Sequence, residues 1–548
     1  MTRDLGRLGR TRYDLLVIGG GIHGLFAAYD AASRGLSVAL VERDDFGAGL
    51  SFNHQRTIHG GLRALQGGHV AKAVQQIRER RTWARIAPHY VRPLPFLVGT
   101  YRRTRRSRAI IGAGFAIYDL LGCRRNAGVA PDLRLRSSHV VSRDEAQTRF
   151  PGIDRNGLTG GAIWCDYQAR HPDRINWLVA RAAIAAGADL ASYADAVEPL
   201  RANGRVTGAR VRVWPTGESR DVEAAATLLC AGAGLAALHA SFGVSGAPPL
   251  VGASNLVLDR PAPAMALAAP GRSGRMLTCV PWNGVALVGT FQSDTTIDPA
   301  EVGSHRLPLE SMLFETAVAF PFLGATTSHV RVVHQGLTPA IVRNGRADLL
   351  PEPVIIRHGA AGVPGVTSLV GVKFTTARAA AAQAIDAICE ELGRAGVRCR
   401  TAEVVLPSAD IPTSRGRRAS ALRIPGGLKP AGHDDLNHAI DAEASAALVD
   451  WYGTEAADVA AYCAAGGLTR PLTEGCRVLA GEIGYAVEHG GVVRLADAVL
   501  RRTPLGGTGH PGDAALHAAA DLMAAKLAWS PAERAAEIAH VEERFNAR

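Results

Sequence analysis

Residues 13–42 read YDLLVIGGGIHGLFAAYDAASRGLSVALVE, and this stretch decides the fold. The apolar run at 15–18 is typical of a buried parallel strand, and it leads directly into the glycine-rich segment 19–24, after which helical spacing begins. A second strand is predicted over 37–41 and ends at Glu42. Because strand, glycine turn, helix, second strand and acidic residue follow one another in this order, the stretch favours a dinucleotide site over a glycine-rich surface turn.

Each glycine of this motif has an expected role. Gly19 permits a tight turn, Gly21 lets the backbone approach a pyrophosphate, and Gly24 lets the helix pack closely on the strand. The N-terminus of the helix then faces the phosphate charge. Glu42 follows the first glycine by about 20 residues, where an acidic side chain can accept hydrogen bonds from an adenosine ribose.

The composition is that of an ordinary globular protein. The chain has 548 residues, of which 47% are hydrophobic and 20% are charged, and its length suggests about two to four domains. Eight cysteines are scattered without a C-x-x-C pair or a metal-ligand spacing, which predicts no metal site and a reducing, cytoplasmic compartment. The sequence shows no secretory signal and no run of the roughly 20 apolar residues that a membrane span needs.

Positive charge is concentrated at one place in the chain, whose formal net charge is +11. An arginine cluster precedes the apolar segment 109–122 and consists of Arg102, Arg103, Arg105, Arg106 and Arg108. Such a cluster can bind nucleic acid, attract an anionic membrane surface or form a solvated face. Nucleic-acid binding is not expected, because no aromatic residues for base stacking are interleaved with the arginines. Peripheral contact with the cytoplasmic face of a membrane is therefore the functional interpretation of the cluster.

The pattern along the chain predicts three domains. Buried strands and glycine-to-helix junctions indicate a discontinuous dinucleotide-binding domain at 13–100, 150–244 and 345–400. Short alternating strands indicate a mostly antiparallel substrate or cap domain at 101–149 and 245–344. Prolines and glycines without periodicity predict a linker at 408–435, and 436–548 has the pattern of a helical domain.

Several motifs are spread over nearly the whole chain. They read DLLVIGGGIHGLFAAYDAASRGLSVALVERDDFGAG, IHGGLRALQ, VPWNGVALVGT, GVKFTTAR and GYAVEHGGVVRLADAVLRRTPLG. Together they resemble the FAD-dependent glycerol-3-phosphate dehydrogenases, within the D-amino-acid-oxidase-like flavoproteins. The first motif would fit many flavoproteins, whereas IHGGLR and the C-terminal segment are specific to this family. The resemblance implies an α/β fold with a Rossmann-type FAD-binding domain, an interleaved antiparallel substrate domain and a helical C-terminal domain.

The resemblance also implies a reaction. FAD would take a hydride from glycerol 3-phosphate or a related secondary alcohol, and the electrons would pass to a membrane quinone. An amine or 2-hydroxy-acid oxidase on the same scaffold, and a flavin-binding protein associated with nucleic acid, are the alternatives. Oxygen as the acceptor and a homodimer as the assembly stay open. We expect noncovalent FAD, although some relatives in the wider group attach it through a histidine in the loop that here contains His54.

Site residues follow from the same resemblance. Cofactor contacts are expected at Gly19, Gly21, Gly24, Glu42, Ser51, Gly60, Gly61, Gly232, Lys373 and Thr375. His59 is the candidate proton acceptor, since an imidazole titrates near neutral pH, although it could instead serve only to hydrogen-bond the loop. Lys373 and the helix N-terminus at Thr375 would stabilise negative charge on the reduced flavin. Arg63 and Arg357 are candidates to hold an anionic substrate group, and Arg357 is also a candidate catalytic residue with His59 and Lys373. For Arg63, a surface salt bridge is the alternative.

Two places depart from the family pattern. Residues 52–56, FNHQR, stand where the family usually has small hydroxyl residues and a lysine. Thr338 occupies the place of an arginine that is expected to bind the substrate phosphate. It is therefore a candidate substrate-binding residue with a neutral hydroxyl in place of a charged guanidinium. Either Arg331, Arg343 or Arg357 takes over the phosphate, or the natural substrate carries less charge at that end.

Overall fold

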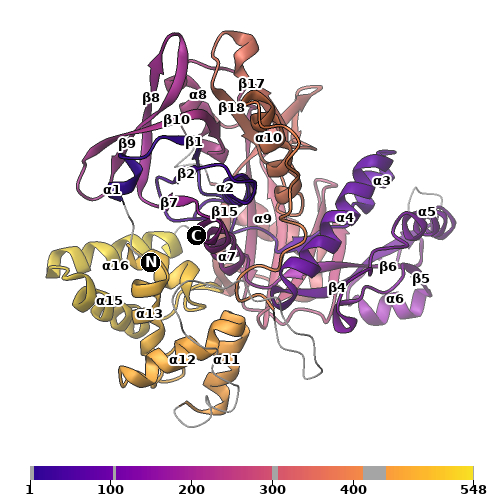
Figure 1. The fold of residues 1–548 in the computed structure, drawn as a ribbon. Coiled ribbons are helices and arrows are strands. Elements are labelled where there is room, and N and C mark those ends of the chain that lie inside the picture. Colours follow the sequence, from indigo (N-terminus) through magenta and orange to yellow (C-terminus); the bar gives the residue numbers. More distant parts are fainter. Residues whose placement is uncertain (1–4, 103–106, 299–300, 302–305, 411–439, 547–548) are drawn as a thin grey trace.

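Two large sheets and a helical C-terminal region make up the computed structural model (Figure 1). It describes residues 5–102, 107–298, 301, 306–410 and 440–546. The architecture confirms the predicted fold class, because a Rossmann-type sheet is interleaved with a mostly antiparallel sheet and helices follow. Most of the predicted linker 408–435 lies outside the described residues, as do Arg103, Arg105 and Arg106.

The first sheet carries the glycine motif at its centre. Its strands in spatial order are β17 (Val354–Arg357), β18 (Val366–Val370), β10 (Ser219–Leu229), β1 (Tyr13–Ile18), β2 (Val38–Val41) and β7 (Asp189–Ala191). The pairs from β18 to β7 are parallel, and β17 is antiparallel to β18. β8 (Ala194–Ala202) and β9 (Arg205–Val213) extend β10 as an antiparallel meander. Strands buried on both faces of a parallel sheet explain the uninterrupted apolar run at 15–18.

Three helices cover the core of this sheet. α2 (Ile22–Ser33) contacts both α7 (Pro172–Ala185) and α10 (Ala377–Glu391). The three helices and the apolar strand residues form one buried cluster, to which α2 and α10 contribute mainly alanines. Small side chains allow the helix backbones to lie close to one another, and this packing fixes the glycine turn that precedes α2.

The second sheet is antiparallel except for one pair. Its strands in order are β16 (Arg346–Leu349), β15 (Val330–Arg343), β11 (Leu250–Leu258), β14 (Val285–Gln292), β13 (Met276–Trp282), β12 (Ala266–Pro270), β4 (Val91–Tyr101), β6 (Leu158–Ala169) and β3 (Thr57–Ile58), with β5 (His139–Val141) beside β6. The exception is the parallel pair β4 and β12. β3, β4 and β6 lie in this sheet, although the segments 13–100 and 150–244 were predicted for the cofactor domain. Local patterns predict a strand but not its distant partner, which explains the difference.

Besides the short helix α1 (Leu5–Leu8), the described residues before 400 contain six further helices. They are α3 (Leu62–Gln66), α4 (Val70–Ile86), α5 (Arg108–Leu121), α6 (Arg143–Arg149), α8 (Leu235–Phe242) and α9 (Leu309–Ala319). α3, α4, α5 and α6 stand together on the side opposite the C-terminal helices (Figure 1). Among the described residues, no helix combines the length and the apolar character needed to cross a membrane.

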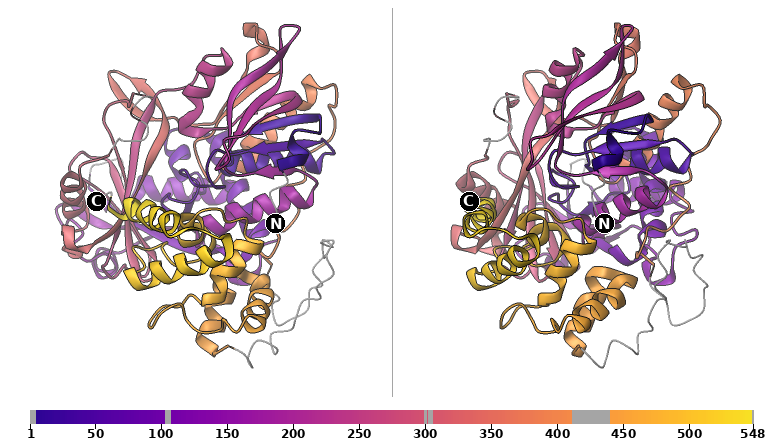
Figure 2. Two further views of the ribbon diagram at one scale, coloured as in Figure 1. Left: turned by 90° about the vertical axis from the view of Figure 1, so that its left-hand side faces the viewer. Right: turned by 60° about the vertical axis from the view of Figure 1, so that its left-hand side comes forward.

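The C-terminal region is helical, as predicted. Its main helices are α11 (Ala442–Tyr452), α12 (Ala456–Ala465), α13 (Ala480–His489), α15 (Asp513–Leu527) and α16 (Pro531–Asn546). They form a layer below the first sheet and pack on one face of the second (Figure 2). A capping box precedes α16, because the Ser530 N–H donates to Glu533 Oε2 at 2.7 Å and the Glu533 N–H donates to Ser530 Oγ at 3.2 Å.

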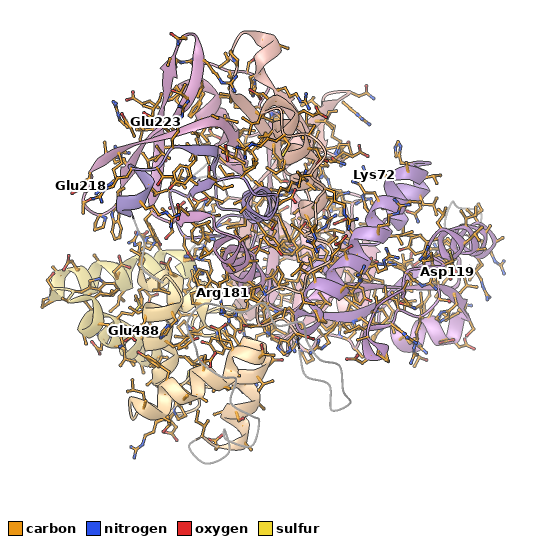
Figure 3. All side chains as sticks on the ribbon, viewed as in Figure 1. Lys72, Asp119, Arg181, Glu218, Glu223 and Glu488 are labelled. Atoms are coloured by element: carbon orange, nitrogen blue, oxygen red, sulfur yellow. The ribbon has the colours of Figure 1, made fainter. Side chains whose placement is uncertain are left out.

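Buried ion pairs join this layer to the cofactor sheet. Arg181 lies on α7 where that helix meets the C-terminal helices (Figure 3), and both Arg181 and Arg174 donate to the carboxylate of Glu455. Asp45, in the loop after β2, accepts hydrogen bonds from Arg501 at 2.6 Å and from Arg502 at 2.6 Å. The loop after β2, which belongs to the cofactor domain, is therefore also bonded to the C-terminal domain.

Candidate functional site

The glycine turn between β1 and α2 has little space around it. Gly19 adopts φ +111°, and a Cβ there would lie 2.6 Å from the carbonyl oxygen of Cys230 at the end of β10. A Cβ on Gly24 would lie 1.9 Å from the carbonyl oxygen of Gly19, so helix and turn touch. Gly21 is the N-cap of α2 and has no capping side chain, which leaves the N–H groups of the first turn after Ile22 to an anion.

Two side chains close around this turn. Glu42 Oε2 accepts a hydrogen bond from the Gly20 N–H at 2.5 Å, and burial raises the pKa of this carboxyl group. Ser51 Oγ accepts from the Ile22 N–H at 2.9 Å in the first turn of α2. Gly232, after β10, adopts φ +54° with open space where a Cβ would be. These residues surround the point at which the parallel strands end, where dinucleotides bind in such sheets.

The segment 51–59 connects this turn with a second helix N-terminus. It begins at Ser51, beside α2, and ends where the His59 N–H donates to Thr375 Oγ1 at 3.0 Å. Thr375 lies two residues before α10, and its carbonyl oxygen accepts from the indole of Trp83. The segment thus spans from a phosphate-binding turn to a second glycine-to-helix junction, as expected of a loop along an extended cofactor.

His59 is paired with an acid that the sequence did not indicate. Its Nδ1 lies 3.2 Å from Asp166 Oδ2, and its side chain is 57% exposed. Asp166 is buried at the end of β6, where its Oδ1 also accepts from the Gly60 N–H at 2.8 Å and from Arg80 at 2.6 Å. Although burial opposes it, the hydrogen bond from His59 and the charge of Arg80 lower the pKa of Asp166. Asp166 is therefore an anion that orients an accessible imidazole.

The two glycines after His59 are explained by packing. A Cβ on Gly60 would lie 2.1 Å from Arg80 Nη1 and 2.2 Å from the Tyr118 hydroxyl. A Cβ on Gly61 would lie 2.9 Å from the Ala73 Cα of α4. Packing therefore explains why glycines stand at 60 and 61: without a Cβ, they let the His59 segment lie directly on α4. The predicted cofactor contact is a separate role for them.

Lys373 lies between β18 and α10, two residues before Thr375, which bonds to the His59 N–H. Burial and the positive charges of Lys72 and Arg63 lower the pKa of Lys373 to about 8, against the opposing effect of Glu352. The structure therefore brings the predicted residues His59, Arg63, Lys373 and Thr375 into one region. Lys72 is an addition that the sequence did not suggest, since a lysine on a polar helix gives no such signal.

Comparison with known proteins decides the family. A family model described as FAD dependent oxidoreductase matches residues 14–406, and another, described as the C-terminal domain of alpha-glycerophosphate oxidase, matches residues 399–534. The chain is 30% identical over 560 residues to glycerol-3-phosphate dehydrogenase of Mycobacterium leprae, which covers 99% of this chain and 89% of the relative. The chain belongs to the FAD-dependent glycerol-3-phosphate dehydrogenase family.

Other relatives agree with this assignment. Glycerol-3-phosphate dehydrogenase of Synechocystis sp. is 28% identical over 524 residues, covering 92% of this chain and 90% of the relative. The solved structure of the Bacillus halodurans glycerol-3-phosphate dehydrogenase, complexed with FAD, has the same fold, with a TM-score of 0.73, 22% identity and coverage of 99% and 96% of the two chains. The chain is thus an FAD-dependent oxidoreductase, and the glycine turn and uncapped α2 fit that cofactor.

The first departure from the family pattern anchors the cofactor loop to the second sheet. Gln55 donates to the carbonyl oxygens of Thr278 and Gly289, at 2.9 Å and 3.0 Å. The Arg56 guanidinium lies 3.6 Å from the centroid of the Trp282 ring. His54 packs against Phe374 with ring centroids 4.6 Å apart, and burial lowers its pKa to about 3. Large side chains thus replace small ones where the two domains meet.

The predicted substrate arginine does not join the other site residues. Arg357 donates to Glu390 Oε2 at 2.5 Å, and its side chain is 54% exposed. Glu390 is near the last residue of α10, about 20 Å along the helix from its start beside Thr375. The resemblance placed Arg357 by its position in the chain alone. Its side chain lies toward the opposite end of α10, apart from the other predicted site residues, and its catalytic and substrate-binding role stays a prediction.

The second departure, Thr338, lies in the middle of β15 opposite Val251. Arg331, near the first residue of β15, forms an ion pair with Asp259 at 2.8 Å. Arg343 is the last residue of the strand and is exposed. They are roughly 23 Å and 16 Å from Thr338 along an extended strand. Neither occupies the position that an arginine at 338 would have.

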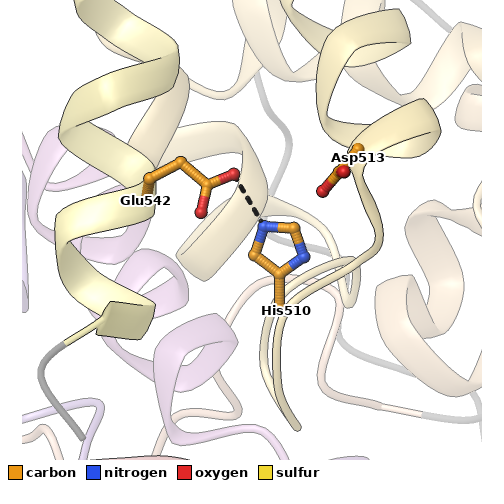
Figure 4. A group of neighbouring side chains, drawn as sticks. All are labelled: His510, Asp513 and Glu542. Atoms are coloured by element: carbon orange, nitrogen blue, oxygen red, sulfur yellow. Dashed lines mark hydrogen bonds and ion pairs between the residues drawn. The ribbon is translucent and has the colours of Figure 1, made fainter.

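A group of possible metal ligands lies outside this site. His510, Asp513 and Glu542 hold their ligand atoms within 4.8 Å of one another, between the start of α15 and the end of α16 (Figure 4). His510 Nε2 lies 2.9 Å from Glu542 Oε1, and its Nδ1 accepts from the Gly512 N–H at 3.1 Å. Both imidazole nitrogens therefore have protein partners, and the group links the two helices.

Proposed function

We propose that this chain oxidises the secondary alcohol of glycerol 3-phosphate, or of a related compound, to the ketone and passes the electrons to a membrane quinone. The supporting observation is the His59 and Asp166 pair, which stands accessible beside Thr375 and Lys373. Alcohol oxidation needs a base for the hydroxyl proton and a stabilised negative charge on the acceptor, and these residues supply both.

The cofactor is assigned to the residues whose geometry suits it. Glu42 would hold the adenosine ribose, and Gly21, Ser51 and Gly232 would surround the pyrophosphate at the N-terminus of α2. FAD, when bound, supplies the hydride acceptor. Lys373 and the N-terminus of α10 would stabilise the negative charge that the acceptor gains.

Proton removal is assigned to His59. An ionised Asp166 can only accept a hydrogen bond, so His59 Nδ1 carries the proton and Nε2 presents a lone pair. Nε2 accepts the hydroxyl proton as the hydride leaves the carbon, and the carboxylate of Asp166 then stabilises the imidazolium. Arg80 keeps Asp166 ionised and fixed from the opposite side.

Contact with the membrane is assigned to α5. Ile110, Ile117 and Leu120 of this helix are exposed, and Leu120 is 73% exposed. Arg108 begins the helix and Arg102 precedes it, so apolar and basic groups occur together, as at membrane-surface helices. The opposite face of α5 donates the Tyr118 hydroxyl to the Gly60 carbonyl oxygen at 3.1 Å. A quinone in the bilayer would therefore be near the His59 segment.

Anaerobic titration of the purified flavoprotein tests the reaction. Glycerol 3-phosphate or another phosphorylated polyol should bleach the flavin absorbance, and subsequent addition of a quinone analogue should restore it. Amines and 2-hydroxy acids serve as comparison substrates, and faster bleaching by either would contradict the proposal. Flotation with anionic liposomes should be lost when Ile117 and Leu120 become Ser, while serines at Arg102, Arg103, Arg105 and Arg106 test the charge contribution.

A further inference from the structure

Lys72 of α4 reaches across to the first sheet. It lies on α4, on the side of the molecule away from the C-terminal helices (Figure 3). Its side chain is only 12% exposed, and Nζ donates to the Pro351 carbonyl oxygen at 2.8 Å and lies 3.3 Å from Glu352 Oε1. Pro351 and Glu352 belong to the connection between β16 and β17. A mostly buried ammonium group is therefore directed at this connection.

The connection lies beside Lys373. β17 and β18 are antiparallel, with Val354 opposite Val370. The connection before β17 and the segment after β18, which contains Lys373, therefore leave the sheet at the same end. Arg63 approaches from α3, four residues after His59. The effects of Lys72, Arg63 and Glu352 on the pKa of Lys373 agree with this placement.

The charges of this group do not balance. Lys72 and Arg63 act on Lys373 with positive charge and Glu352 with negative charge, and Glu352 is already paired with Lys72, so these four groups carry a net charge of +2 when Lys373 is protonated. Like charges held together in a partly buried place repel one another unless an anion joins them. A phosphate monoester carries about −1.5 to −2 charges at neutral pH and matches this excess. The Glu352 side chain is 60% exposed and can turn to solvent when an anion arrives.

We propose that Lys72 completes a phosphate site with Arg63 and Lys373, so that the substrate is a phosphorylated alcohol even though Thr338 replaces an arginine. This inference rests on the proposed function, because it places the phosphate of the same substrate. The phosphate displaces Glu352 from Lys72, and the alcohol carbon extends toward His59, which follows Ile58 on the same loop as Arg63. Lys72 is a residue that determines specificity and takes no part in the proton step.

Binding of inorganic phosphate to the FAD-loaded enzyme tests the site without turnover. The perturbation of the flavin spectrum, or calorimetry, gives the affinity for the wild type, Lys72→Met, Lys72→Arg and Glu352→Gln. We expect Lys72→Met to weaken phosphate binding about 10-fold or more, since a hydrogen bond to a charged group is lost. Lys72→Arg should retain most of the affinity, and Glu352→Gln should tighten binding because the competing carboxylate is neutral.

Turnover adds an independent readout. Lys72→Met should raise KM for glycerol 3-phosphate more than it lowers kcat, and Lys526→Met, which removes an exposed ion pair with Glu488, should change neither.

Equal phosphate affinity in the wild type and Lys72→Met would overturn the inference. If Lys72→Met does not fold, unchanged affinity in Glu352→Gln would overturn it instead. If no alcohol bleaches the flavin, the proposed reaction fails, whereas phosphate binding still decides the role of Lys72.

Discussion

The imidazole of His59 and the carboxylate of Asp166 face each other with Nδ1 3.2 Å from Oδ2, although 107 residues separate them in the chain. His59 comes from the loop along the cofactor, and Asp166 comes from β6 of the antiparallel sheet. The pair forms where β3 runs antiparallel to β6: Ile58 lies opposite Tyr167, so the next residues, His59 and Asp166, face each other. It gives the site an oriented base whose partner is held by a third group, Arg80.

Substitutions at the two positions should have different consequences. His59→Ala should lower kcat by about 10²- to 10⁴-fold with little loss of stability, since this side chain is exposed and acts in proton transfer. Asp166→Asn should also lower kcat, and in addition should reduce the free energy of unfolding by about 3 to 5 kcal/mol, because it leaves Arg80 buried without a charge partner. Stopped-flow reduction of the flavin measures the effect on the rate, and urea unfolding measures the effect on the free energy of unfolding. A full rate of flavin reduction in His59→Ala would contradict the base assignment.

Loss of FAD is expected from Gly21→Val. The new side chain would stand at the N-terminus of α2, beside Ser51 Oγ, in the space that the pyrophosphate needs. The ratio of flavin to protein absorbance after gel filtration measures occupancy. Gly507→Val is the matched control, because a Cβ there meets open space in the C-terminal domain. Full occupancy in Gly21→Val would place the cofactor elsewhere.

Much of the fold was predictable because it depends on local patterns. The run at 15–18, the glycines after it and the capping box at Ser530 and Glu533 each specify their own conformation, and the structure shows all three. Asp166 was not predictable. It is one acidic residue within a strand, and its role arises from the pairing of β3 and β6, which sets it beside His59, and from Arg80 on α4, which sequence spacing does not reveal.

Arg357 is the predicted site residue that the structure places apart from the others. The resemblance carried a role to a sequence position, but a side chain acts where its backbone directs it. Arg357 lies opposite Thr367 near the start of β18, whereas the site lies beyond the end of that strand. Charge and exposure were both consistent with a ligand-binding arginine, so only the register of β17 and the ion pair with Glu390 could distinguish the two locations.

The buried contact between Asp45 and the C-terminal arginines should stabilise both domains. Asp45→Asn would leave Arg501 and Arg502 without part of their charge compensation, so the free energy of unfolding should fall by about 3 to 5 kcal/mol. FAD occupancy should fall as well, since the Gly47 N–H beside Asp45 donates to the Gly20 carbonyl oxygen at 2.9 Å. Asp521→Asn, in an exposed ion pair with Arg534, is the control and should cost less than about 1 kcal/mol. Equal melting temperatures for the two variants would contradict this account.

Lys373 should give the enzyme a characteristic pH dependence. Its pKa of about 8 means that the cation is lost as pH rises through 8, so kcat/KM for a phosphorylated substrate should fall above that pH. Lys373→Arg keeps the charge and should remove this limb of the profile. Stability should change in the opposite direction: the unfolded lysine keeps its proton to about 10.5, so the cost of holding the Lys373 cation in the folded protein disappears as pH rises from 8 to 10.5, and the free energy of unfolding rises. A profile unchanged in Lys373→Arg would contradict the assignment.

Thr338 and Lys72 can be tested against each other. If Lys72 supplies the phosphate contact that an arginine at 338 would otherwise give, Thr338→Arg should restore activity in Lys72→Met. A hydrogen bond to a charged group contributes about 1.5 to 3 kcal/mol, so kcat/KM for glycerol 3-phosphate should recover by about 10- to 150-fold in the double variant. The gain in the wild-type background should be smaller, because the phosphate is already paired, and this difference is the coupling that a double-mutant cycle measures.

Thr338→Met controls for side-chain size without charge, and Arg357→Ala should leave all of these values unchanged because its side chain pairs with Glu390. Independent, additive effects of Thr338→Arg and Lys72→Met would mean that the two positions do not serve the same phosphate group.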